Sequence, residues 1–332
     1  MERAADWQLA NPSKHEATDW TQGAGDTGMM ALAGISGNAK YRESMRATGD
    51  AARWQPGRRM YNADDHCVGQ TYAELYLLSR ENAMIAPLRA RFDAILSAPS
   101  RLQSLDFKPS SGDPLENWSW CDSLFMAPPA WVRLAAATGN GAYTRFAVDQ
   151  WWETTQFLYD RQEHLYYRDS TFFNKREANG TKVFWSRGNG WVIAGIARTL
   201  EFLPPDTPAR ARFESLYREL AARLVGLQQP DGFWRTSLLD PASFPMIESS
   251  GTGLICFGLA WGMNHGILDR AATEPAILRA WAAIAGCVEA DGKVNHVQPV
   301  GSSPDKFPAE STVPYGVGAF LLAGSEVARI RP

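Results

Sequence analysis

The sequence lacks the patterns that metal and redox proteins carry. Its histidines show no HxxxH spacing and no pairing with acidic ligands, and they are His15, His66, His164, His265 and His296. Its cysteines are far apart, without a CxxC motif, and they are Cys67, Cys121, Cys256 and Cys287. We therefore expect free thiols, structural histidines and no bound metal.

Charge of one sign and long apolar runs are also missing. The formal net charge is −3 and the basic residues are scattered, which argues against a nucleic-acid partner. No apolar run is long enough to span a bilayer, and residues 1–6 lack the basic and apolar regions of a signal peptide. The chain as given is expected in the cytoplasm, or in the periplasm if an export signal precedes Met1.

Nucleotide and hydrolase fingerprints are absent too. The sequence has no G-x-G-x-x-G motif, no Walker loop and no G-x-S-x-G elbow. These absences argue against a dinucleotide-binding protein, a phosphate-binding loop and an α/β-hydrolase. Aromatic residues are abundant instead, with 13 Trp, 10 Tyr and 15 Phe. Flat aromatic faces suit the apolar C–H faces of sugar rings, so this composition is a weak indication of a carbohydrate cleft.

Helical periodicity dominates the chain, and strand-like alternation is confined to stretches near 165–167 and 181–184. An all-α fold is therefore predicted, in one domain spanning residues 1–332. The expected helices are 2–9, 24–34, 38–53, 68–79, 82–97, 122–137, 140–159, 190–203, 207–229, 252–265, 269–288 and 316–329.

The connections between these helices alternate in length. Short turns such as Gly37-Asn38 and Gly139-Asn140 are followed by long, aromatic-rich segments. Six helical hairpins that close into a ring would bring all long segments to one end, where function is expected. Those segments are 55–67, 98–121, 160–189, 230–251 and 289–315.

Asp122 is the first candidate for chemistry. It lies at the start of a predicted helix, after Trp118 and Trp120 and before Met126. Apolar neighbours raise a carboxyl pKa and suit it to general acid catalysis, whereas the helix N-terminus opposes that shift. A plain helix N-cap is the alternative. If the acid role holds, Trp120 and Met126 are expected beside the substrate.

A second cluster holds Asp64, Asp65 and His66, just before another predicted helix. Adjacent carboxylates cannot both point the same way. One can face the cleft, to hold the substrate or tune the proton of Asp122, while the other caps the helix. Both can equally be caps or surface charges.

Arginines and tryptophans complete the candidate site. Arg187 lies between Trp185 and Trp191, and it is either a bidentate clamp for a substrate carboxylate or an arginine stacked structurally on those rings. Arg168 is a second candidate clamp. In two further loops, Trp234 and Thr252 offer an aromatic platform and a hydroxyl, or else turn and cap chemistry.

Five segments together resemble the unsaturated glucuronyl and rhamnogalacturonyl hydrolases of glycoside hydrolase families 88 and 105. They are ADDHCVGQTY around Asp65, WCDSLFMAPP around Asp122, WSRGNGWVIAG around Arg187, ESSGTGLICFGLAWG from Glu248 and YGVGAFLLAG from Tyr315. The resemblance implies an (α/α)6 barrel, in agreement with the six hairpins, and an enzyme that needs no metal or cofactor.

The resemblance also implies a reaction. The aspartate at position 122 would protonate C4 of a terminal 4,5-unsaturated uronate, an oxocarbenium-like centre would form at C5, and the same carboxylate would help water to add there. The hemiketal would then collapse and release the shortened sugar. One acid/base thus replaces the two carboxylates of ordinary glycosidases. Asp65 resembles the family's second aspartate, with Asp64 as the fallback.

The sequence departs from the family at residues 166–169. Where several members have a pattern like YHAWD, this chain has Tyr166, Tyr167, Arg168 and Asp169, so Arg168 replaces a substrate-binding histidine. Arg168 can read a different neighbouring sugar or a second negative charge. Rhamnogalacturonan fragments are the first expected substrates and glucuronyl-capped oligosaccharides the second.

Two other functions remain open from the sequence. A sugar epimerase on a helical barrel generally needs paired histidines, in which this chain is poor. A non-catalytic sugar-binding scaffold would keep the aromatic mouth without a working acid. In each case the partner is an oligosaccharide, and the chain is expected as a monomer or weak dimer.

Overall fold

Helices form almost all of the regular structure. The structure is a computed structural model, and it describes residues 1–102, 104–108 and 112–330. In this part of the chain the α-helices are α1 (Glu2–Ala10), α2 (Trp20–Ala33), α3 (Ala39–Ala51), α4 (Gly69–Ser79), α5 (Ala86–Ser97), α6 (Ser123–Met126), α7 (Pro128–Thr138), α8 (Gly141–Leu158), α9 (Ser186–Leu200), α10 (Arg210–Leu227), α11 (Ser249–Asn264), α12 (Arg270–Ala285) and α13 (Pro314–Val327).

Shorter elements lie in the connections. The 3₁₀ turns are η1 (Ala63–His66), η2 (Asn82–Met84), η3 (Pro114–Glu116) and η4 (Ser170–Phe172). The strands β1 (Tyr159–Asp160) and β2 (Leu165–Tyr166) form an antiparallel pair in which Tyr159 faces Tyr166.

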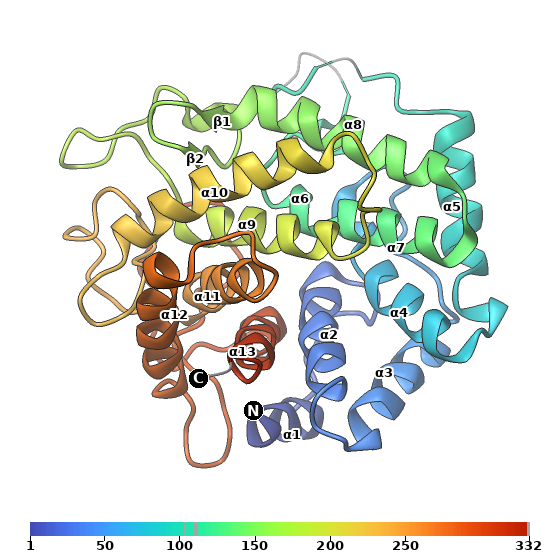
Figure 1. Cartoon of the computed structure of the whole chain (residues 1–332), viewed down its shortest axis with the longest axis horizontal. Helices are drawn as coiled ribbons and strands as arrows, with labels where there is room; N and C mark the ends of the chain where they lie inside the picture. The colour runs from blue at the N-terminus through green and yellow to red at the C-terminus, as the bar shows by residue number, and fades with distance from the viewer. Residues whose placement is uncertain (103, 109–111, 331–332) are drawn as a thin grey trace.

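The helices are arranged as two concentric rings (Figure 1). The inner ring runs α2, α4, α7, α9, α11, α13, and α13 returns to contact α2, so the ring is closed. The outer helices α1, α3, α5, α8, α10 and α12 alternate with them along the chain. Because successive helices run in opposite directions, every outer-to-inner connection reaches the same end of the barrel. We call that end the mouth.

Short turns close the opposite end, and their residues explain why. Gly139 ends α7 with a positive φ of 74°, a conformation that costs glycine little. Asn140 then caps α8 by accepting a hydrogen bond from the backbone N–H of Ala142 at 3.0 Å. Two residues therefore suffice to reverse the chain at this end.

Glycines allow the inner helices to pack closely. A Cβ atom on Gly28 of α2 would clash with the backbone of Gly318 in α13, and one on Gly318 would clash with Ala24. The first and last inner helices therefore touch backbone to backbone. This contact closes the ring without a large side chain between them.

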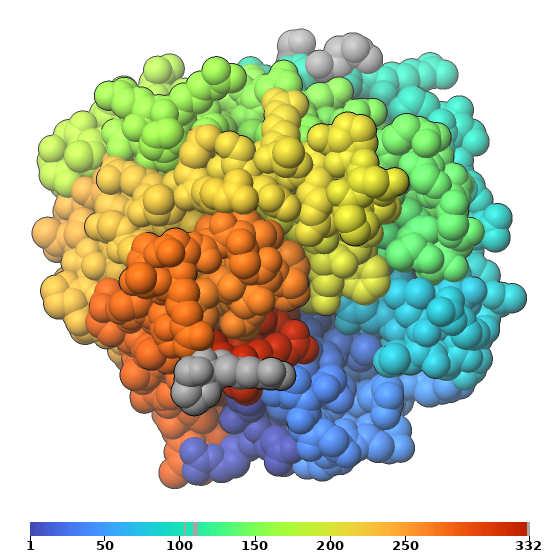
Figure 2. All heavy atoms as spheres, viewed as in Figure 1, coloured from blue at the N-terminus to red at the C-terminus, as the bar shows by residue number. Residues whose placement is uncertain are grey.

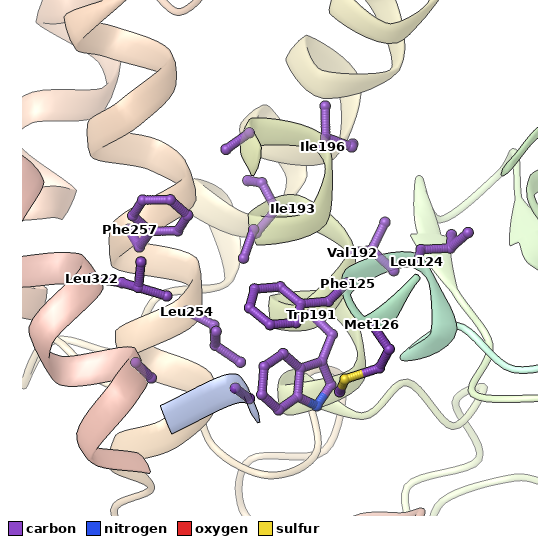
Figure 3. Packing of buried hydrophobic residues seen from close by; sticks show 14 of the residues in the cluster. Leu124, Phe125, Met126, Trp191, Val192, Ile193, Ile196, Leu254, Phe257 and Leu322 are labelled. Atoms are coloured by element: carbon purple, nitrogen blue, oxygen red, sulfur yellow. The ribbon is translucent and has the colours of Figure 1, made fainter. Parts of the chain in front are cut away.

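Large apolar side chains fill the interior. Figure 3 shows Phe125 and Met126 of α6 meeting Trp191 and Ile193 of α9, with Leu254 of α11 next to them. All of these side chains are buried. On the face seen in Figure 2, α13 in red is set back between the neighbouring orange and blue segments. The core of the inner ring thus continues to the N-terminal end of α6, where Asp122 lies.

A buried charge network joins three inner helices near the closed end. Arg133 of α7 is fully buried and donates to Glu74 of α4 and to Glu201, which follows α9, each at 2.6 Å. Arg198 of α9 donates to the same Glu74 at 2.8 Å. A buried charge is tolerated only when it is paired and hydrogen-bonded, and this network meets that condition.

The predicted all-α barrel is confirmed, with differences at helix starts. The sequence placed three inner helices too late, at 24, 190 and 252, whereas they begin at Trp20, Ser186 and Ser249. The expected helix 122–137 is interrupted between Met126 and Pro128, because a proline lacks the N–H that a continuous helix would need. Each difference concerns a segment that enters the barrel from the mouth.

Candidate active site

Asp122 lies at the mouth, immediately before α6. Its side chain is 10% exposed and makes no capping hydrogen bond. The carboxylate oxygen Oδ2 lies 3.6 Å from Nε of Arg168 and 3.8 Å from Sγ of Cys121. The simple N-cap reading therefore does not describe this side chain, which faces an arginine instead of the helix backbone.

Burial raises the pKa of Asp122 above its ordinary value, while the positive charges of Arg168 and then Arg187 oppose that rise. Desolvation of this kind keeps a carboxyl group protonated to a higher pH than usual, and a positioned carboxyl can then release its proton to a substrate. These are the properties that a general acid needs.

Arg168 is held in place from two sides. Its Nη1 donates to Oδ2 of Asp169 at 2.7 Å, and its guanidinium lies 4.6 Å from the centre of the Phe107 ring. Asp169 is fixed in turn, since its other oxygen accepts from the backbone N–H of Thr171 at 2.8 Å. Nε of Arg168 is buried without a hydrogen-bond partner among the described residues. This arginine is therefore a rigid positive charge next to Asp122.

The two adjacent aspartates of the second cluster have different surroundings. Oδ2 of Asp65 accepts from the backbone N–H of Arg59 at 2.5 Å, and Oδ1 accepts from the Arg59 guanidinium at 2.6 Å. Asp64 has no such close partner: the nearest ion pair joins it to the Arg59 guanidinium at 4.0 Å. Asp65 therefore fixes its own loop.

The pKa of Asp64 depends on the other charges at the mouth. Burial raises its pKa to about 7, Arg59 opposes the rise, and the negative charge of Asp122 adds to it. Asp64, the fallback of the sequence reading, is thus the aspartate that interacts with Asp122. The structure therefore favours Asp64 over the expected Asp65 as the second aspartate of the site, because Asp65 is occupied by Arg59.

Both ring nitrogens of His66 are occupied by other residues. Its ring is buried, with Nε2 at 3.0 Å from the carbonyl oxygen of Met60 and Nδ1 at 3.3 Å from the indole nitrogen of Trp131. Burial lowers its pKa to about 4, so the imidazole is neutral at physiological pH. These contacts give His66 a structural role, and its expected place beside the substrate stays a prediction.

Arg187 is a structural arginine as well. Its Nη1 donates to the carbonyl oxygen of Gln298, and its Nη2 donates to that of Pro299 at 2.9 Å. The guanidinium lies between the rings of Trp185 and Tyr315, 4.5 and 4.9 Å from their centres. Both terminal nitrogens are occupied, so of its two alternatives the stacked arginine is correct. It still contributes positive charge at Asp122.

The expected aromatic platforms are almost completely buried. The rings of Trp120, Trp185, Trp191 and Trp234 are each at most 2% exposed, as is Met126. They form the walls behind the site and not its surface. Figure 3 shows Met126 and Trp191 side by side in that wall.

Trp234 and Thr252 join two helices. The indole N–H of Trp234 donates to the carbonyl oxygen of Leu224 at 2.7 Å, and its backbone N–H donates to the Thr252 hydroxyl at 3.1 Å. Both residues are fully buried. These bonds use the polar groups of both residues to tie the 228–248 connection to α10 and α11, which favours the alternative of turn and cap chemistry over contact with substrate.

A model of one protein family matches residues 1–331, and that family is described as Glycosyl Hydrolase Family 88. The chain belongs to Glycosyl Hydrolase Family 88. The resemblance found in its sequence segments is thereby confirmed.

Two similar proteins bear the same name. An unsaturated 3S-rhamnoglycuronyl hydrolase of Formosa agariphila is 38% identical to this family 88 chain, over 99% of the chain and 90% of that protein. A protein of the same name from Alteromonas sp. is 37% identical, over 98% of the chain and 84% of that protein.

A solved structure agrees over the whole barrel. The structure of a glycosyl hydrolase family 88 protein from Bacteroides vulgatus has a TM-score of 0.89 and 29% identity, covering 99% of this chain and 97% of that one. The (α/α)6 barrel that the resemblance implied is therefore the fold of this family 88 chain.

Four residues that were not predicted as site residues support the candidate site of this family 88 chain. Trp20 at the start of α2 is half-buried and stacks on Tyr315, with 5.3 Å between ring centres and an angle of 12°. Phe107, Arg59 and Asp169 hold Arg168 and Asp65. The start of α2 at Trp20 could have been predicted from Asp19, an N-cap residue that accepts a hydrogen bond from the backbone N–H of Thr21.

Other kinds of site are not found in the described part of this family 88 chain. No group of three or more His, Cys, Asp or Glu side chains there is arranged to hold a metal ion. Among the same residues, every helix is too short or too polar to cross a bilayer.

Proposed function

We propose that Asp122 donates the proton with which this family 88 hydrolase removes a terminal 4,5-unsaturated uronic acid from an oligosaccharide. The observation that carries the proposal is the pairing of a buried carboxyl that has no capping bond with the rigid guanidinium of Arg168, 3.6 Å away. In an ordinary buried ion pair the two groups would share hydrogen bonds. Here Arg168 bonds to Asp169 instead, which leaves the Asp122 carboxyl available to a ligand.

The proposed chemistry follows from these groups. Asp122 gives its proton to C4 of the double bond, and positive charge develops at C5, where the ring oxygen shares it. Water then adds to C5 and returns a proton to the Asp122 carboxylate, so the acid is regenerated. The resulting hemiketal opens, and the shortened sugar leaves. Asp64, whose pKa is raised to about 7, is a second titratable carboxyl group beside Asp122 during these steps.

The substrate carries a carboxylate, and Arg168 is its proposed partner. The guanidinium is 15% exposed and has charge to offer beyond its bond to Asp169. Arg187, the other candidate clamp, has both terminal nitrogens bound to backbone carbonyls. Arg168 is therefore proposed to bind the carboxylate of the uronate, in place of Arg187.

We propose further that a rhamnose residue follows the uronate in the substrate. The two relatives with 37 and 38% identity are both named for a rhamnoglycuronyl group. Rhamnogalacturonan fragments were the first substrates expected from the sequence, and the type of uronate is left to experiment. Oligosaccharides without rhamnose are the second candidates.

A panel of unsaturated oligosaccharides tests the proposal. Fragments made by lyases, with and without rhamnose next to the unsaturated uronate and with and without sulfate on that rhamnose, are incubated with the protein. We expect the enol-ether absorbance to fall fastest with a rhamnose-containing fragment. Unchanged absorbance with every fragment would rule out the hydrolase, and equal rates with all of them would rule out the preference.

Replacing Arg168 by methionine should change the pH dependence in a defined direction. Arg168 lowers the pKa of Asp122, so its removal raises that pKa. Because Asp122 must be protonated to act, turnover falls as pH rises through its pKa, and the alkaline limb of kcat should move to higher pH. The pH profile of Arg168→Met is compared with that of Arg42→Met, which changes an exposed arginine on α3. A limb that stays in place in both variants contradicts the assignment.

A further inference from the structure

A cavity lies at the mouth, on the outer side of the barrel. It has a volume of about 530 Å³ and is lined by residues of α5 and α8 and by described residues after α5, which are Pro99, Ser100, Leu102, Leu105, Glu116, Asn117 and Trp118. Tyr61 and Trp118, from the loops that carry Asp64 and Asp122, form part of its wall. Because α8 begins at the short turn of the closed end, its C-terminal half reaches the mouth (Figure 1). The cavity therefore backs onto the same two loops that form the candidate active site.

Hydrogen-bond acceptors in this cavity are only partly used. Oε2 of Glu116 accepts from the Ser100 hydroxyl at 3.0 Å, and Oε2 of Glu153 accepts from the Gln150 amide at 2.9 Å. Among the described residues, nothing donates to the remaining oxygen of either carboxylate. A ligand with several hydroxyl groups can supply the missing donors.

The charge of the cavity disfavours anions. Among the described residues, its lining contains the carboxylates of Glu116 and Glu153 and no lysine or arginine. A uronate that entered would meet two like charges without a cation to pair with it. This is the opposite of the Asp122 site, where Arg168 supplies positive charge.

Aromatic rings give the cavity apolar surface of fixed orientation. Phe146 is half-buried and is backed by Trp131, with 4.2 Å between ring centres. Phe157 is half-buried and packs edge-on against Phe173 at 5.4 Å. Rings that are braced in this way can receive the C–H face of a pyranose without losing further freedom.

We infer that this cavity binds an uncharged pyranose residue, at a site separate from the one that contains Asp122. The hydroxyl groups donate to Glu116 and Glu153, and the apolar face of the sugar packs on Phe146 and Phe157. The inference rests on the proposed function only in taking a saccharide as the ligand. Its role is to hold the neutral part of a long oligosaccharide beside the mouth.

The test uses the full chain with Asp122→Asn, so that binding is measured without turnover. Methyl glycosides of rhamnose, glucose and xylose, and the methyl glycoside of glucuronic acid, are titrated by calorimetry and by saturation-transfer NMR. We expect saturable binding of at least one uncharged glycoside and at least about tenfold weaker binding of the glucuronide, since two unpaired like charges face it.

Two matched variants locate the binding. Glu153→Ala should weaken it about tenfold by removing a charged acceptor, whereas Asp149→Ala, on the exposed face of the same helix, should not change it. Circular dichroism verifies that both variants are folded. Equal affinities in the two variants, no binding of any uncharged glycoside, or tighter binding of the glucuronide would each overturn the inference. Turnover of unsaturated fragments by the wild-type chain is measured separately, so failure of this site leaves the proposed function standing.

Discussion

Asp122→Asn is expected to lower turnover of an unsaturated uronyl oligosaccharide by about 10²–10⁴-fold, the range that a general acid contributes. Asparagine has nearly the shape of aspartate and carries no acidic proton. The side chain makes no capping hydrogen bond that the change could break. We therefore expect the variant to fold and to bind substrate at least as tightly, because a negative charge has been removed from a site that receives a carboxylate. Loss of enol-ether absorbance measures turnover, and calorimetry measures binding.

Asp206→Asn is the matched control. Asp206 is exposed in the turn between α9 and α10, at the closed end of the barrel, and the change there should leave turnover unaffected. Retention of more than about a tenth of wild-type turnover in Asp122→Asn would contradict the acid role. Loss of both turnover and binding would point to a structural carboxylate instead.

The helices were predictable where a local signal marks them, and not where packing overrides that signal. The turn at Gly139 and Asn140 carries its own capping chemistry, so the hairpin around it was found. The starts of α9 and α11 were missed because Gly188 and Gly251 have low helix propensity. A Cβ on Gly188 would lie 3.0 Å from Sγ of Cys121, and one on Gly251 would lie 3.0 Å from the backbone N of Arg187. These glycines are helical because neighbouring segments approach them closely, which only the folded chain reveals.

The sequence was sufficient to predict which residues lie in the candidate site, but not what each of them does there. Asp122 and Arg168 stand in segments whose pattern indicates function. The roles of His66 and Arg187, however, depend on partners distant in sequence: the His66 ring contacts Trp131, 65 positions away, and the Arg187 guanidinium binds Gln298, 111 positions away. No local pattern reveals that these side chains are already occupied. The choice between Asp64 and Asp65 likewise depended on Arg59, whose guanidinium holds only one of them closely.

Asp64→Asn should change catalysis, whereas Asp65→Asn should change stability. Asp64 and Asp122 repel each other when both are ionised, and this repulsion raises the pKa of Asp64. Removing Asp64 removes a group that titrates near pH 7 beside Asp122, so the step that it contributes to the pH profile of kcat should disappear. At neutral pH we expect turnover to fall about tenfold to a hundredfold, because the proton that Asp64 holds beside Asp122 is lost.

In Asp65→Asn the loss should appear in the free energy of unfolding. The Asp65 carboxylate accepts both the backbone N–H and the guanidinium of Arg59, and hydrogen bonds to charged groups contribute about 1.5–3 kcal/mol each. Since the Arg59 side chain is about half exposed, we expect the lower end of that range in total. Denaturant unfolding and pH profiles of the two variants are measured side by side. If Asp65→Asn shifts the pH profile and Asp64→Asn does not, Asp65 is the partner of Asp122 after all, and the electrostatic reading of the mouth is wrong.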